Sequence, residues 1–123
     1  MDYDVVIIGG GPSGLATAIK LAQSFKEKNL DKSICVLEKS AEIGGHILSG
    51  NVFETTALDE LIPDWKEKGA PLDVKVKRDA IKFLINDKYS LPVPSFVMPT
   101  MQNHGNYILS LGNLCKWLAE QAE

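Results

Sequence analysis

The segment Val5 to Ala18, VVIIGGGPSGLATA, constrains the fold more than any other part of the chain. An apolar run leads into glycines at positions 9, 11 and 14, and helix-forming residues follow them. The spacing G-x-G-x-x-G between a strand and a helix is typical of a dinucleotide cradle, in which helix N–H groups face the pyrophosphate. Pro12 suits the first helical position, because the N–H that it lacks would have no partner within the helix.

The flanking residues supply the context that a glycine motif lacks by itself. Val5 to Ile8 is typical of a buried parallel strand, and apolar residues from Leu15 to Phe25 recur at helical spacing. A second apolar run, Ile34 to Leu37, ends at Glu38, about 20 residues beyond the glycines, where a carboxylate accepts hydrogen bonds from ribose hydroxyls and disfavours NADP. The alternative is that the glycines only form a turn and that Glu38 is a solvated charge at the end of a strand. The predicted nucleotide contacts are Gly9, Gly10, Gly11, Pro12, Ser13, Gly14, Glu38 and Lys39.

Length and organisation predict an incomplete α/β domain. The 123 residues, 45% of them hydrophobic and 24% charged, are typical of a soluble globular chain. No strand with a second crossover helix follows Leu37, and the chain stops inside a helix predicted over Leu111 to Ala122. We therefore expect the Rossmann-like βαβ start of a dinucleotide-binding domain, with an incomplete sheet. Residues 1–123 would be the amino-terminal part of a larger protein.

Charge and residue types exclude several functions. A net charge of −3 argues against a nucleic-acid partner. Cys35 and Cys115 lie in no metal-ligand spacing, so we predict no metal site in this segment. No nucleophilic triad or carboxylate pair suggests a catalytic side chain. We expect no signal or transit peptide and no membrane span, and therefore a cytoplasmic-facing protein whose membrane contact is peripheral.

A second glycine pair, Gly44 and Gly45, lies in AEIGGHILSG after Glu38. Glycines here would let the chain pass close to a flavin or its pyrophosphate, as FAD proteins require, and Gly45 joins the predicted cofactor contacts. The alternative is an ordinary loop after a strand.

Residues 53–65, FETTALDELIPDW, predict a short amphipathic helix. Its apolar face either packs on a domain core or lies in a membrane interface. The membrane interpretation draws support from the lysines that follow, which would attract anionic head groups. Its contact residues would be Leu58, Leu61, Ile62 and Trp65.

Beyond this helix the pattern turns to antiparallel structure. Val74 and Val76 alternate with lysines, as in a half-exposed strand. The segments 81–85 and 89–93, joined by Asn86, Asp87 and Lys88, predict a β-hairpin that belongs to a different sheet. The proline-rich residues 91–101 predict an extended connection.

Three strings make the chain resemble one family closely: GGHILSG at 44–50, PDWKEKGAPL at 63–72 and QNHGNYILSLGNL at 102–114. In this order they resemble electron transfer flavoprotein:ubiquinone oxidoreductase along nearly the whole chain. The resemblance implies a glutathione-reductase-type flavoprotein fold that carries FAD, with the glycines at the phosphates and Glu38 at the adenosine ribose. It also places the family's membrane-contacting segment on 43–64, and an inserted quinone- and membrane-facing region on about 43–100.

The implied activity is electron transfer from reduced electron transfer flavoprotein to ubiquinone at the membrane. The membrane would be a bacterial inner membrane, or the mitochondrial inner membrane in eukaryotic relatives. The family's 4Fe-4S cluster would be bound outside this segment. Two alternatives remain: another FAD enzyme, either an NADPH-dependent hydroxylase or a geranylgeranyl-reductase-like protein, and a truncated nucleotide-binding module without activity.

Overall fold

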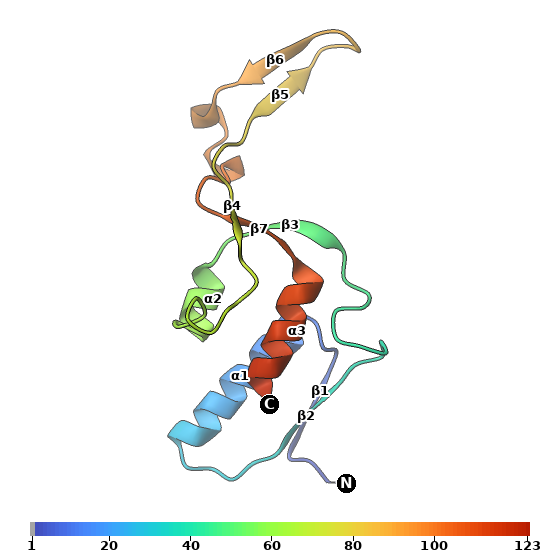
Figure 1. Ribbon diagram of the computed structural model, residues 1–123, viewed down its shortest axis with the longest axis vertical. Coiled ribbons are helices and arrows are strands. Elements are labelled where there is room, and N and C mark those ends of the chain that lie inside the picture. The colour runs from blue at the N-terminus through green and yellow to red at the C-terminus, as the bar shows by residue number, and fades with distance from the viewer. Residues whose placement is uncertain (1) are drawn as a thin grey trace.

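A computed structural model describes residues 2–123, and it begins with the predicted nucleotide-binding unit (Figure 1). Strand β1 (Val5–Ile8) leads into helix α1 (Pro12–Glu27), and strand β2 (Ile34–Leu37) follows. The two strands pair in parallel, from Val5 opposite Ile34 to Ile8 opposite Leu37. This confirms the predicted β-α-β order, and the sheet to which β1 and β2 belong has two strands.

A polar cluster at the start of the two strands fixes their alignment. Oδ1 of Asp4 accepts from Nζ of Lys32 at 2.7 Å. Oδ2 of Asp4 accepts from the backbone N–H of Ser33 at 2.9 Å and from its hydroxyl at 3.0 Å. These bonds join the residue before β1 to the two residues before β2, so a slip in the pairing would break all of them.

A second, antiparallel sheet has the order β3-β7-β4 and was not predicted as a sheet. Its strands are β3 (Ser49–Phe53), β4 (Val74–Lys75) and β7 (Tyr107–Ser110). The middle strand β7 runs directly into helix α3 (Leu111–Ala122), whose predicted bounds are confirmed. The side-chain oxygen of Ser110 caps this helix by accepting from the N–H of Asn113 at 3.4 Å.

The core lies where α3 packs on α1, side by side in Figure 1, with helix α2 (Thr56–Leu61) beside them. Apolar side chains that are at least nine-tenths buried come from all three helices and from the segments after α2 and in β7. They are Leu15, Ile19, Leu58, Ile62, Trp65, Leu72, Leu109, Leu114, Cys115, Trp117 and Leu118. Cys115 is fully buried, and this burial raises the pKa of its thiol.

The structure corrects the membrane interpretation of α2. Leu58, Ile62 and Trp65 are only 3–4% exposed and belong to the core, and Leu61 packs partly buried against it. The helix is also shorter than predicted, because Phe53 belongs to β3 and Ile62 ends the helix. Trp65 is held in place as its Nε1–H donates to Oδ1 of Asp59 at 2.6 Å. Leu58, Ile62 and Trp65 therefore have almost no surface to offer to lipid.

The predicted β-hairpin is confirmed, and it projects away from the helices at one end of the molecule (Figure 1). Strand β5 (Ile81–Leu84) pairs with β6 (Ser90–Val93). The expected extended connection is wrong beyond β6, because residues 95–97 and 99–101 form two 3₁₀ turns, η1 and η2. Within residues 2–123, no helix has the length and apolar character needed to cross a membrane.

Candidate dinucleotide-binding site

The glycine-rich turn between β1 and α1 has the backbone geometry that its sequence predicts. Gly9 has a φ of +105°, a conformation that L side chains rarely adopt. A Cβ at Gly14 would overlap the carbonyl oxygen of Gly9, so only glycine allows the helix to approach the turn this closely. A Cβ at Gly11 would meet nothing within 4 Å. The space beside Gly11 is therefore open on the side from which a pyrophosphate approaches.

Helix α1 begins at Pro12 with Gly11 as its N-cap, and no side chain in residues 2–123 caps it. The first N–H groups of a helix have no partner within the helix and carry the positive end of its dipole. Ser13 is exposed at this end, and its carbonyl oxygen accepts from the hydroxyl of Thr17 at 2.8 Å. An uncapped helix start beside an open glycine backbone fits an anionic phosphate.

Glu38 lies at the carboxyl end of β2 and reaches back to the glycine turn. Its Oε2 accepts from the N–H of Gly10 at 2.7 Å, and its Oε1 accepts from the N–H of Ser40 at 2.8 Å. These backbone hydrogen bonds, from Ser40 first and Gly10 second, lower the pKa of Glu38. The side chain therefore carries a full negative charge at neutral pH. Each oxygen keeps a lone pair that can accept from a ribose hydroxyl.

The segment that follows Glu38, residues 39–47, folds over the turn, and we call it the 39–47 loop. The side chain of Ile43 occupies the space that a Cβ at Gly10 would need. A Cβ at Gly45 would overlap Oγ of Ser40, so the loop is also folded tightly on itself. Lys39 is exposed at its start. The contributions of Ser40 and Ile43 are not predictable from the sequence, since a backbone donor and an aliphatic contact leave no signal in a single sequence.

The structure thus gathers most predicted cofactor residues in one place. The turn, the start of α1 and Glu38 meet through the contacts of Gly10, and the 39–47 loop lies beside them. The four residues predicted to touch a membrane do not join this site, because they lie in or against the core. The residues present fit a dinucleotide whose phosphates lie on the turn and whose ribose lies at Glu38.

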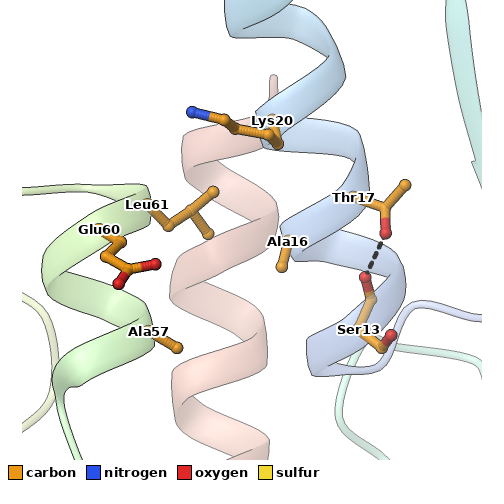
Figure 2. A pocket seen from close by; sticks show the side chains of 7 residues that line it. All are labelled: Ser13, Ala16, Thr17, Lys20, Ala57, Glu60 and Leu61. Carbon is orange, nitrogen blue, oxygen red and sulfur yellow. Dashed lines mark hydrogen bonds between the residues drawn. The ribbon is translucent and has the colours of Figure 1, made fainter.

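A pocket lies elsewhere, between α1 and α2 (Figure 2). It has a volume of about 440 Å³ and is lined by Ser13, Ala16, Thr17, Lys20, Ala57, Glu60 and Leu61. Gly9, Gly11 and Glu38 are not among its lining residues, so this pocket is not the nucleotide cradle. No group of three His, Cys, Asp or Glu side chains in residues 2–123 is arranged to hold a metal ion.

The fold and the site together define a Rossmann-type dinucleotide-binding unit. Sequence comparison agrees, because residues 7–65 match the family of NAD(P)-binding Rossmann-like domains. The family resemblance is also confirmed: along its whole length the chain is homologous to proteins named electron transfer flavoprotein-ubiquinone oxidoreductase.

Three of these relatives show how far the similarity extends. The protein from Pseudomonas aeruginosa is 56% identical over 100% of this chain and 22% of its own length. The mitochondrial proteins from Dictyostelium discoideum and Rattus norvegicus are 56% and 50% identical over 98% and 99% of this chain, and each is covered to 20% of its length. The chain therefore spans about a fifth of the length of the curated relatives that it matches.

Proposed function

We propose that this chain is the amino-terminal part of the FAD-binding domain of an oxidoreductase that passes electrons from reduced electron transfer flavoprotein to ubiquinone. The observation that carries the proposal is the site itself: a glycine turn open at Gly11, an uncapped helix start and the Glu38 carboxylate, in a chain 48–56% identical along its length to proteins with that name. When bound, the flavin supplies the redox chemistry, because it accepts one or two electrons.

The residues of this chain then bind and orient the cofactor. The N–H groups at the start of α1 hold the pyrophosphate, and Gly11 lets the backbone approach it. Glu38 accepts from the adenosine ribose and repels a 2′-phosphate, which disfavours NADP at this position. No side chain of the site needs to act as nucleophile or base, since electron transfer makes no covalent bond to the protein. The ligands of a 4Fe-4S cluster would come from parts of the protein outside residues 1–123.

The hairpin β5–β6 is the part of this chain best suited to peripheral membrane contact. Alternation along the two strands places three cross-strand pairs on one face: Ile81 with Val93, Phe83 with Leu91, and Ile85 with Tyr89. Phe83, Leu91, Ile85 and Tyr89 are 55–67% exposed. We call these six residues the hairpin face. A contiguous apolar face of this kind marks an interaction surface.

Charge favours an anionic bilayer as the partner of the hairpin face. Residues 75–93 contain five basic side chains, Lys75, Lys77, Arg78, Lys82 and Lys88, against two acidic ones, Asp79 and Asp87. All five basic side chains are exposed. Lysine and arginine beside an apolar surface attract anionic head groups. The inserted region proposed for about 43–100 would then contact the membrane through the hairpin and not through α2. The cytoplasmic face of a bacterial inner membrane, or the mitochondrial inner membrane, would offer such lipids.

Anaerobic reduction of the purified full-length protein tests the electron-transfer proposal. Reduced electron transfer flavoprotein should bleach the flavin absorbance promptly, and a soluble ubiquinone analogue should restore it. NADPH should leave the spectrum unchanged. Prompt bleaching by NADPH would instead identify another kind of FAD enzyme. A protein that stays colourless after FAD is supplied would be a nucleotide-binding module without this activity.

A further inference from the structure

Two glycines far apart in sequence form a backbone-to-backbone contact next to the nucleotide site. Gly44, in the 39–47 loop, has a φ of +83°. A Cβ at Gly44 would lie 2.6 Å from the carbonyl oxygen of Gly112 and 2.9 Å from its Cα. Gly112 is buried in the first turn of α3, and a Cβ there would lie 3.1 Å from the carbonyl oxygen of Gly44. Backbone atoms cannot rotate away as a side chain does, so this approach requires glycine at 44.

A second contact joins the same loop to the same helix. Nζ of Lys116, in α3, lies 2.9 Å from Oε2 of Glu42. Both side chains are about half exposed or more, so the ion pair by itself adds little. It is nevertheless a contact between the loop and α3 that is separate from the glycine contact. The loop therefore meets α3 at two points, through Gly44 and through Glu42.

The other side of the loop meets the nucleotide site. Ile43 lies against Gly10, and the N–H of Ser40 donates to the same carboxylate that accepts from Gly10. Helix α3 in turn packs along α1, whose start forms the phosphate end of the site. The glycine turn thus contacts the 39–47 loop, the loop contacts α3, and α3 packs on α1, which begins at the same turn. Moving the loop away from α3 would move Ile43 and Ser40 relative to Gly10.

We infer that Gly44 and Gly112 are positioning residues that hold the 39–47 loop against the glycine turn, so that α3 contributes to FAD affinity through this loop. The effect on FAD rests on the proposed function, whereas the effect on the loop does not. In this arrangement Glu38 presents its carboxylate with both backbone donors already in place, and less of the binding free energy is spent on ordering the loop.

The test compares Gly44→Ala with Gly69→Ala in the full-length protein. Gly69 also has a positive φ, +71°, but a Cβ there meets nothing within 4 Å. Both variants therefore strain the backbone, and only Gly44→Ala also pushes the loop away from α3. We expect Gly44→Ala to raise the FAD dissociation constant on the order of tenfold, which corresponds to about 1.4 kcal/mol. Gly69→Ala should leave the constant within twofold, roughly the spread of a neutral substitution. Equal weakening by both variants would overturn the inference.

A second measurement needs no FAD. In the apoprotein, amide hydrogen exchange of Gly10 and Ser40 should be faster in Gly44→Ala than in the wild type and unchanged in Gly69→Ala, because Ser40 belongs to the loop and Ile43 of the loop lies against Gly10. If the wild type bound no FAD, the proposed function would fail, and the exchange rates would still decide the positioning role. Unchanged exchange in Gly44→Ala would refute that role.

Discussion

At the scale of single residues, the glycines of the G-x-G-x-x-G motif differ in whether the fold itself requires them. Gly14 is needed by the protein, because a Cβ there would overlap the backbone of Gly9. The fold itself does not require glycine at position 11, because a Cβ there would meet no protein atom within 4 Å. The motif alone does not reveal this division, since it depends on where neighbouring backbone lies.

This division predicts different outcomes for two matched substitutions. Gly11→Ala should leave the melting temperature of the apoprotein within a few degrees of the wild type and weaken FAD binding on the order of tenfold or more, because the new methyl group lies in the path of the pyrophosphate. Gly14→Ala should lower the melting temperature and also weaken FAD binding, since the turn must shift to accept the methyl group. Thermal unfolding and flavin titration measure the two effects. A stable, FAD-binding Gly11→Ala protein would contradict the assignment of the phosphate site.

Asp4 provides a pH prediction at the same scale. Hydrogen bonds from Lys32 first, and then from Ser33, lower the pKa of Asp4 to about 2. A depressed pKa in the folded state means that the stabilisation is fully present above the unfolded value of about 3.9 and is lost as the pH falls towards the folded value. Asp4→Asn should therefore be less stable than the wild type near neutral pH, and the difference should shrink between about pH 4 and pH 2. Melting temperatures across this range check it. A constant difference would show that the charge of Asp4 is not involved.

At the scale of secondary-structure elements, the parts with strong local signals follow the prediction closely. The bounds of β1, β2 and α3 match, and α1 begins at the predicted proline. The sheet β3-β7-β4 was missed because its strands are short and pair across long sequence distances: Phe53 lies opposite Tyr107, and Val74 lies opposite Ile108. Local periodicity does not indicate which distant segments of the chain pair with each other. The amphipathic pattern of α2 was recognised, but a pattern shows only that a face is apolar and not what covers it.

The burial of α2 can be tested directly. Leu58→Ala should lower the free energy of unfolding by about 2–5 kcal/mol, the usual cost of removing a buried leucine side chain from a core. Leu84→Ala is the control, because Leu84 is 74% exposed on the hairpin and its truncation should change stability by less than about 0.5 kcal/mol. Denaturant unfolding of both variants measures the effect. Similar stability of Leu58→Ala and the wild type would show that the apolar face of α2 is not buried in the core.

At the scale of the whole molecule, one end carries the helices and the nucleotide site, and the other end carries the hairpin (Figure 1). The two ends are joined through β4 and β7 and by the segments that continue from them towards the hairpin. Val76 and Asn106 extend this pairing, since the N–H of Val76 donates to the oxygen of Asn106 at 2.7 Å. The sequence predicts each end by itself, but not that they lie at opposite ends of the molecule, because their separation follows from the unpredicted pairing of β7.

This arrangement predicts that membrane contact can be removed without loss of the cofactor. Phe83→Ser combined with Leu91→Ser, two residues of the hairpin face, should reduce binding of the full-length protein to anionic vesicles at least about tenfold, because each buried apolar side chain contributes about 1.5–3 kcal/mol. FAD content should stay the same. Leu84→Ser is the matched control, since Leu84 is more exposed but lies on the opposite face of the hairpin. Vesicle sedimentation measures binding. Loss of FAD together with loss of vesicle binding would show that the hairpin face packs on the protein itself.

The two tryptophans of the chain give it a built-in optical reporter. Trp65 meets Tyr107 edge-on with ring centroids 5.9 Å apart, and Nε1–H of Trp117 donates to the carbonyl oxygen of Lys68 at 3.0 Å. Both indoles are shielded from water, so their emission should lie at short wavelength and shift to the red only when the helices separate. The hairpin contains no tryptophan, and its contact with a bilayer should leave this emission maximum where it is.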